Sequence, residues 1–163
     1  MILPPSPFTR EQFLARGHGR RELSRLVEAG EVVRLRRGCY AQPTRDDPRA
    51  GWEGQVDQHL ERLTCALASR PGHAASHTTA ALVHGLAVTV APETPVHLTT
   101  VDRVGASRCY PGLRIHRSES VVNDTEVVDG VRCTRLVRTV ADVLRTRTLP
   151  HGLALLDDVL RRG

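Results

Sequence analysis

Arginine side chains give this sequence its clearest chemistry, because a guanidinium group binds phosphate oxygens through paired hydrogen bonds. Arg21 and Arg25 are four residues apart, and Arg34 and Arg36 alternate with apolar residues further along the chain. The first spacing places two guanidinium groups on one face of a helix, and the second places two on one face of a strand. The pattern favours a surface that binds the backbone of a nucleic acid. The alternative is a small helical hairpin whose arginines only form a charged, solvated face.

Two short helices should carry the first of these arginines. Thr9 and Gln12 have the spacing of a capping box at the start of a helix, and Phe8 and Phe13 have that of a hydrophobic staple. This helix should end near Gly17, where a Gly-His-Gly run allows a sharp turn. A second helix is expected from about residue 20 to residue 30, with an apolar stripe of Leu23, Leu26 and Val27 opposite Arg21, Ser24, Arg25 and Glu28.

A basic hairpin should follow the second helix. Val33 and Leu35 alternate with Arg34 and Arg36, residues 37–38 can turn, and residues 39–41 can return as a partner strand. Helix, turn, helix and hairpin is the order of a winged helix, in which the second helix enters the major groove and the wing lies along the phosphates. The sequence therefore predicts a DNA-binding domain at this end of the chain.

The rest of the chain predicts a second small domain. Residues 42–54 are polar and contain proline and glycine, which is typical of a linker, so we expect a winged helix-turn-helix domain over residues 1–41 and a mixed α/β domain over residues 55–163. The expected fold class is α+β. All 23 basic residues are arginines, and the charge is +4 over residues 1–50 but only +1 over residues 51–163. Most of the positive excess thus lies at the proposed DNA-binding end.

Helical and strand periods alternate in the second domain. Helices are expected over residues 56–70 and 76–85, the second with Ser76 as its N-cap, and a hairpin is expected around Asp129-Gly130. A loop with Arg103 and Arg108 should lie between two strands. Thr134 is expected to cap a further helix that carries an exposed Arg138–Asp142 pair, and a last helix should follow Pro150 with Leu153, Leu156 and Leu160 on its apolar side.

No catalytic or metal-binding constellation is evident. Cys39, Cys65, Cys109 and Cys133 lack the spacing of a zinc finger and suggest neither zinc nor a disulfide framework, so buried reduced thiols are expected. His77 and His84 lie seven residues apart on one helical face, but no neighbouring ligand completes a metal set, and polar roles at the two helix ends are preferred. Asp157 and Asp158 point about 100 degrees apart on a helix, one expected toward solvent and one toward a neighbouring helix.

The residues that the sequence lacks also limit its possible functions. Without lysine, the chain cannot form the usual phosphate loop or the acid-x-lysine pair of many nucleases. We therefore expect no enzyme activity, no catalytic residue, no metal and no cofactor. The N-terminus does not resemble a signal peptide, and no apolar run approaches the roughly 18 residues of a membrane span, so a cytoplasmic protein without a membrane partner is expected.

Taken together, these segments resemble the AbiEi family of type IV antitoxins and the related front end of very-short-patch-repair-like nuclease proteins. The resemblance extends over nearly the whole chain and is carried by PFTREQFLARGHGRREL, RLRRGCYA, SHTTAALVHGL, GVRCTRLVRTVADVL and ALLDDVLRRG. It implies a winged helix that binds operator DNA, followed by an α/β domain used in protein contacts and in DNA binding. Arg138, Thr139 and Asp142 match an RT-x-x-D element of the family, for which we expect a structural role.

The resemblance also implies a function. Such antitoxins repress their own operon and counteract a nucleotidyltransferase-like toxin encoded beside them, with which they need not form a stable complex. The residues that this implies as contacts to double-stranded operator DNA are Arg20, Arg21, Ser24, Arg25, Arg34, Arg36 and Arg37. Two alternatives remain: the chain is the non-catalytic N-terminal portion of a very-short-patch-repair-like endonuclease, or it is a protein-interaction module whose basic front has no specific ligand.

Overall fold

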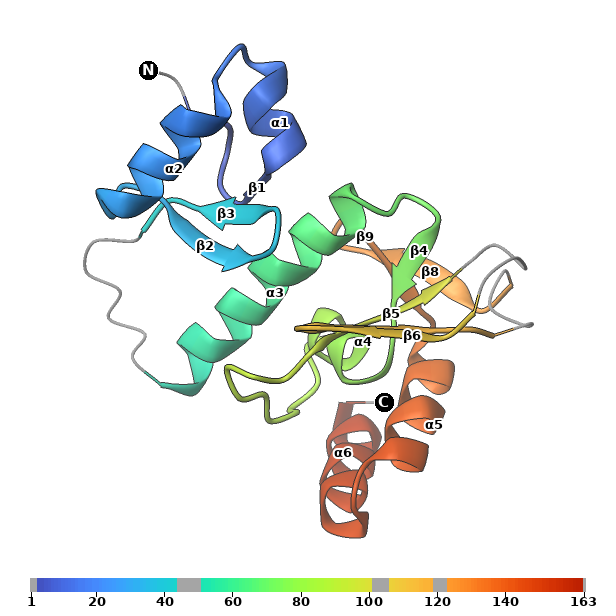
Figure 1. The fold of residues 1–163 in the computed structure, drawn as a ribbon. Helices are drawn as coiled ribbons and strands as arrows, with labels where there is room; N and C mark the ends of the chain where they lie inside the picture. Colours follow the sequence, from blue (N-terminus) through green and yellow to red (C-terminus); the bar gives the residue numbers. More distant parts are fainter. Residues whose placement is uncertain (1–2, 44–50, 101–105, 119–122, 163) are drawn as a thin grey trace. The chain divides into compact units, whose positions relative to one another are not determined.

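The computed structural model describes residues 3–43, 51–100, 106–118 and 123–162. The chain divides into two compact units, Met1–Ser69 and Arg70–Gly163, both drawn in Figure 1. Each unit contains helices and a sheet of its own, in agreement with the expected α+β class. Among the described residues, no helix is both long and apolar enough to cross a membrane.

The N-terminal unit follows the predicted order of helix, turn, helix and hairpin. Its elements are β1 (Phe8–Thr9), α1 (Arg10–Ala15), α2 (Arg20–Glu28), β2 (Val33–Arg36), β3 (Cys39–Ala41) and α3 (Trp52–Ala68). Strand β3 pairs antiparallel with both β1 and β2, which gives a three-stranded sheet of order β1-β3-β2. The short strand β1, which precedes the first helix, was not predicted.

Local capping chemistry fixes the first helix as expected. The backbone amide of Gln12 donates to Thr9 Oγ1 at 3.2 Å, and the backbone amide of Thr9 donates to Gln12 Oε1 at 2.7 Å. Both halves of the capping box are therefore formed. Phe8 and Phe13 are buried with their ring centroids 6.0 Å apart, which confirms the hydrophobic staple. Burying one such side chain stabilises a fold by roughly 1.5–3 kcal/mol.

A single small core holds the helices on the hairpin. Its members are buried side chains from β1, α1, α2 and the segment before β2, namely Phe8, Phe13, Leu23, Leu26 and Val32. The turns that let these elements meet need left-handed backbone: Gly30 has φ 71° after α2, and Gly38 has φ 79° between β2 and β3. Only glycine adopts such angles without a steric penalty.

The boundary between the units differs from the expected linker. Residues 44–50 lie outside the described residues, and residues 52–54 form the first turn of α3. Helix α3, which the sequence analysis assigned to the second domain, belongs to the N-terminal unit and packs against β1 and β3. The division between the units falls after Ser69.

This division changes the expected distribution of charge. Residues 1–69 contain eleven arginines and nine acidic residues, whereas residues 70–163 contain twelve arginines and nine acidic residues. The excess is therefore +2 in the N-terminal unit and +3 in the C-terminal unit. The concentration of charge seen in the first 50 residues is offset by Glu53, Asp57 and Glu61 of α3.

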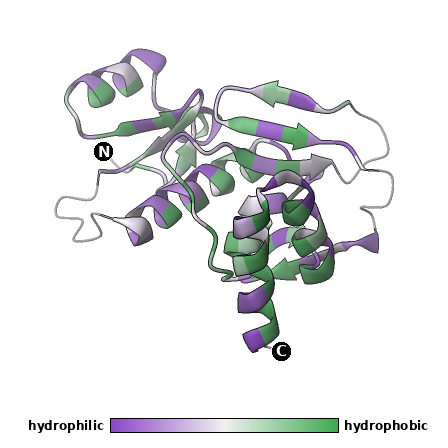
Figure 2. Cartoon of the chain, turned by 90° about the horizontal axis from the view of Figure 1, so that it is seen from below, coloured by the Kyte–Doolittle hydropathy of each residue, from purple (hydrophilic) through white to green (hydrophobic). Residues whose placement is uncertain are grey.

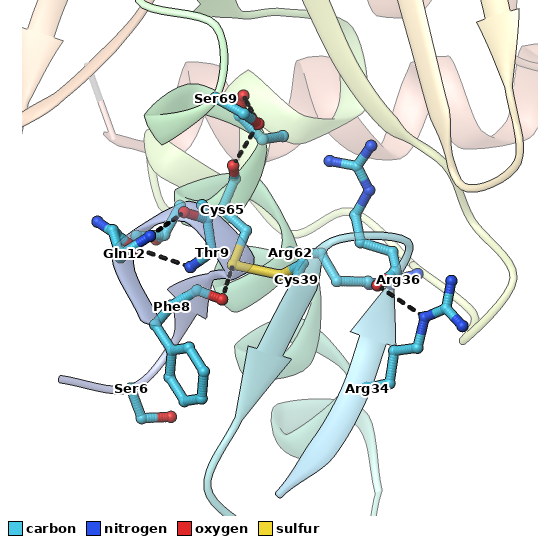
Figure 3. The surroundings of a disulfide bond; sticks show 12 residues. Ser6, Phe8, Thr9, Gln12, Arg34, Arg36, Cys39, Arg62, Cys65 and Ser69 are labelled. Carbon is cyan, nitrogen blue, oxygen red and sulfur yellow. Dashed lines mark hydrogen bonds between the residues drawn. A yellow bond between two sulfur atoms is a disulfide. The ribbon is translucent and has the colours of Figure 1, made fainter. Parts of the chain in front are cut away.

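The expectation of four reduced thiols was wrong for two of the cysteines. Cys39 of β3 and Cys65 of α3 form a disulfide with their Cα atoms 5.8 Å apart, as Figure 3 shows. The bond lies at the interior of the N-terminal unit, where Cys65 Sγ is 3.6 Å from the Phe8 carbonyl oxygen. The 26-residue separation carries no signature motif, so the pairing arises only from the packing of α3 on β3. Cys133 is a buried free thiol as predicted, and Cys109 is exposed.

In its described residues, the C-terminal unit is a mixed sheet with three helices. Its strands are β4 (His73–Ala75), β5 (Val96–Thr100), β6 (Arg108–Tyr110), β7 (Leu113–His116), β8 (Thr125–Val128) and β9 (Val131–Thr134), and its helices are α4 (His77–Val83), α5 (Leu136–Thr146) and α6 (Leu149–Arg162). The strand order is β6-β7-β5-β4-β9-β8. Strands β5 and β7 are parallel, as are β4 and β9, and the other neighbours are antiparallel.

Turn chemistry again agrees with the prediction. The β8–β9 hairpin turns at Asp129 and Gly130, which have φ values of 48° and 78°, as a two-residue hairpin loop requires. The loop predicted around Arg108 was wrong in part, because Arg108 belongs to β6 and pairs opposite Ile115. Arg103 lies outside the described residues.

Two predictions for the last helices also need correction. Thr134 does not cap α5: the N-cap is Arg135, while Thr134 is buried and its hydroxyl lies 2.7 Å from the Thr139 hydroxyl. Helix α6 buries Leu155 instead of the predicted stripe, because Leu153 and Leu160 are exposed. Figure 2 shows hydrophobic segments along this helix, which ends at the C-terminus.

Candidate nucleic-acid interface

The start of α2 is fixed by an acidic side chain. Glu22 Oε2 accepts a hydrogen bond from the Gly19 amide at 3.2 Å and lies 3.3 Å from His18 Nδ1. A carboxylate in the first turn also interacts favourably with the helix dipole. The helix then buries Leu23 and Leu26 in the core and leaves its arginines exposed.

Arg21 and Arg25 lie on the exposed side of α2. Both side chains are exposed, and their spacing places them one turn apart on the same face. No hydrogen bond or ion pair holds either guanidinium group to another described residue. An exposed guanidinium group of this kind can bind a phosphate in bidentate fashion.

A groove beside this face brings further predicted residues together. It has a volume of about 390 Å³ and is lined by residues of α1, α2 and the hairpin: Arg10, Arg20, Leu23, Ser24, Val27, Glu28, Arg34 and Tyr40. Three of its lining residues, Arg20, Ser24 and Arg34, were predicted as DNA contacts. Its charged lining comprises three arginines and one carboxylate, that of Glu28.

The sequence analysis missed Arg10 and Tyr40 as part of this surface. Tyr40 pairs with Phe8 across β1 and β3, and the Arg10 amide donates to the Gly38 carbonyl oxygen at 3.0 Å. These contacts bring the start of α1 beside the hairpin. Local sequence signals gave no indication of the β1–β3 pairing, because its partners are about 30 residues apart in the chain.

The hairpin arginines are not equivalent. Arg34 is exposed, and its Nε donates to the Arg36 carbonyl oxygen at 3.4 Å, as drawn in Figure 3. The β2–β3 register shifts between Arg34 and Arg36, which leaves Arg36 half-buried. Arg37 lies at the turn and is exposed. Arg34 and Arg37 are therefore the two hairpin arginines most accessible to an external phosphate.

The histidines at the two ends of α4 have separate contacts, in line with the preference for separate polar roles over a metal pair. His84 Nε2 lies 2.8 Å from the Thr134 carbonyl oxygen. His77 instead meets His97 of β5 and His116 of β7, with the nearest ring nitrogens of the three all within 4.8 Å of one another. The sequence analysis named neither His97 nor His116 as a candidate.

The two neighbouring aspartates of α6, Asp157 and Asp158, have different contacts. Asp157 pairs with Arg161 on α6, while Asp158 accepts a hydrogen bond from the Ala87 amide at 2.9 Å and pairs with Arg162. Asp157 is exposed as expected, whereas Asp158 is half-buried against the segment after α4 and not against a neighbouring helix.

One comparison with known proteins identifies the N-terminal segment. Residues 5–43, roughly a quarter of the chain, match the family model described as a transcriptional regulator, AbiEi antitoxin. The match confirms the AbiEi antitoxin resemblance for this segment. No curated protein matches the chain. The AbiEi segment contains α1, α2 and the β2–β3 hairpin, and hence every residue predicted to contact DNA. The family description is that of a transcriptional regulator, and it applies to the matched segment.

Proposed function

We propose that the N-terminal unit binds double-stranded operator DNA as a winged helix, with α2 in the major groove and the β2–β3 hairpin along the phosphates. The observation that carries the proposal is the coincidence of the AbiEi match with the arginine surface of α2. Arg21 and Arg25 face outward without a protein partner among the described residues, and the adjoining groove adds Arg20 and Arg34.

The contact residues divide into two groups in this proposal. Arg21 and Arg25, with Arg20 and Ser24 beside them, approach the base edges and flanking phosphates as α2 enters the groove. Arg34 and Arg37 bind the backbone outside it, and Arg36 supports the hairpin from its half-buried position. Glu28 lines the same groove and repels phosphate, so it limits how closely DNA approaches that part of α2.

The biological role proposed is that of a type IV antitoxin that represses its own operon. The protein would act in the cytoplasm, on DNA upstream of its gene and against a nucleotidyltransferase-like toxin encoded beside it. If so, expression of the full chain restores growth to cells that produce that toxin, and no stable complex of the two proteins need be isolated. Continued growth arrest in the presence of the folded chain would contradict the antitoxin role.

Fluorescence anisotropy with labelled promoter DNA tests the DNA-binding proposal. About four to six phosphate contacts predict a slope of roughly −4 to −5 in a plot of log affinity against log salt concentration. Arg21→Ala/Arg25→Ala should weaken binding at least tenfold and make the slope less steep by about two units. Arg145→Ala is the matched control, because Arg145 is an exposed helical arginine of the other unit. A flat salt response, or equal affinities of the two variants, would refute the assignment of α2.

A further inference from the structure

Three histidines from three separate elements of the C-terminal unit meet at one point. His77 is the first residue of α4, His97 lies in β5 and His116 ends β7. His97 and His116 are brought together by the parallel β5–β7 pairing, in which His97 lies opposite Arg114 and Thr99 opposite His116. Because side chains alternate along each strand, both rings project from the same face of the sheet.

The rings are in direct contact with one another. His97 Nδ1 lies 2.9 Å from His116 Nε2, and the His77 ring stacks on that of His116 with centroids 3.8 Å apart. His77 and His97 are each only 8% exposed. The nearest ring nitrogens of all three residues lie within 4.8 Å of one another, so one ion could reach all of them.

We propose that His77, His97 and His116 form a three-histidine site for a transition-metal dication, Zn²⁺ in the first instance. Imidazole nitrogen is a preferred ligand of zinc, and three protein ligands with a fourth position for water make a recurrent zinc site. With bonds of about 2.0–2.1 Å, tetrahedral ligands lie roughly 3.3 Å apart. Ring rotations that bring the most distant nitrogens about 1.5 Å closer therefore complete the site.

Burial and nearby charges act on two of the three rings. Burial, assisted by the neighbouring His77 and by Arg114, lowers the pKa of His116 to about 4, against the opposing effect of Asp142. Burial also lowers the pKa of His77, where Asp142 opposes the shift and Arg138 and Arg114 add to it.

Residues next to the three histidines orient their rings and balance the local charge. Ser76 Oγ lies 3.1 Å from His77 Nδ1, which directs the other ring nitrogen of His77 toward a metal. Asp142 is nearby and buried, and its charge is shared with Arg138 at 2.9 Å, so Arg138 does not oppose a cation as a lone charge would. Arg114 is exposed and is screened by solvent.

The backbone of His77 gives an independent indication. Its φ is 52°, in the left-handed region that residues other than glycine seldom adopt. Strained backbone of this kind costs of order 1–3 kcal/mol and clusters at ligand sites, where it holds a side chain in position. Here it is found at one of the three ligands proposed from the positions of their rings.

Cobalt and zinc titrations of the untagged full chain, treated with chelator and dialysed, test the proposal. One equivalent of Co²⁺ should give the intense visible bands of tetrahedral coordination, and Zn²⁺ should displace it at one equivalent. Binding should weaken at least tenfold in His116→Gln. His84→Gln is the matched control, because His84 is a half-buried histidine near Cys133 and Glu126 that could bind metal separately.

Each outcome decides the proposal. Tight binding that survives in His116→Gln, or that is lost in His84→Gln, would place the metal elsewhere. The absence of saturable binding by the wild-type chain at tens of micromolar metal would refute the site outright. Circular dichroism of the metal-free proteins shows whether His116→Gln folds. If it does not, imidazole nitrogen NMR of the wild-type chain replaces it, and zinc must then shift the resonances of His77, His97 and His116 and leave that of His84 in place.

Discussion

At the scale of single residues, His59 of α3 is the clearest source of pH-dependent stability. It is completely buried, and burial, followed by the nearby Arg62 charge, lowers its pKa to about 4. In the unfolded chain this group binds a proton below a pKa of about 6.5. The neutral ring thus supports folding fully above pH 6.5, and that stability is lost as the pH falls from about 6.5 to 4, by roughly 3 kcal/mol in total.

Urea unfolding at pH 7.5, 6 and 4.5 measures this loss, with the fluorescence of Trp52 as the signal. Trp52 is the only tryptophan and begins α3, so it reports on the N-terminal unit. His59→Gln should flatten the pH dependence, because the amide does not titrate and its oxygen can accept from Arg62, as His59 Nδ1 does at 3.4 Å. His151→Gln, an exposed histidine of α6, serves as control. An unchanged profile in His59→Gln would show that other groups cause the acid sensitivity.

The residue scale also shows what local sequence could predict. The capping box of Thr9 and Gln12 and the turn at residues 129–130 depend on neighbours within four residues, and both are formed as expected. The meeting of His77, His97 and His116 depends on which strands pair in parallel. That choice rests on the burial of whole strands, so no spacing along the chain reveals it. The position of Arg10 in the groove beside α2 likewise depends on a strand pairing, that of β1 with β3.

At the scale of elements, the Arg138–Asp142 pair joins α5 to the sheet. The exposed pair expected from its spacing would contribute only a few tenths of a kcal/mol, but Asp142 is 5% exposed. Arg138 Nε donates to both Asp142 oxygens, at 3.0 and 2.9 Å, and its terminal nitrogens reach Asp124 and Ser118. The RT-x-x-D element was expected to have a structural role. Its physical basis is that Asp142 is a buried carboxylate whose principal partner is Arg138.

Removing that partner should be costly. Arg138→Met leaves a buried carboxylate unpaired and should lower the free energy of unfolding by about 3 kcal/mol, measured by urea denaturation with circular dichroism. Arg138→Met/Asp142→Leu should recover most of the loss, because neither charge remains. Arg145→Met, on the exposed side of α5, should change stability by less than about 0.5 kcal/mol. A loss below about 1 kcal/mol in Arg138→Met would mean that the pair is well solvated after all.

Helix existence was easier to predict than helix orientation. The helices of the described residues begin within a few residues of a local signal, but α6 buries Leu155 and leaves Leu153 and Leu160 exposed. Its leucines occur on several faces, so their spacing supported more than one buried stripe. The neighbouring α5 selects among them, because Gly152 allows close approach to Leu144.

At the scale of the whole molecule, the disulfide makes α3 part of the proposed DNA-binding unit. It closes a loop between Cys39 and Cys65, 26 residues apart, and loop-closure entropy predicts about 3 kcal/mol of stabilisation. The boundary predicted at residues 42–54 missed this connection, because the polar segment marks a break in secondary structure and carries no information on how α3 packs.

Thiol counting and unfolding test the connection together. The denatured wild-type chain should show two reactive thiols, Cys109 and Cys133, and four after reduction. Reduction should lower the stability reported by Trp52 fluorescence by about 3 kcal/mol, and Cys39→Ser/Cys65→Ser should show no further loss on reduction. Four reactive thiols in protein prepared without reductant and under air would contradict the pairing.

The nearly equal charge of the two units bears on how the proposed binding to operator DNA should depend on salt. At physiological ionic strength electrostatic attraction is screened beyond about 8 Å, so capture by DNA depends on the local arrangement of arginines and little on net charge. In dilute salt the field of the whole molecule acts, and the +3 excess of the C-terminal unit then adds to the attraction of the polyanion. Sliding along random DNA should therefore dominate at low salt, whereas sequence discrimination should improve as salt is raised toward cellular levels.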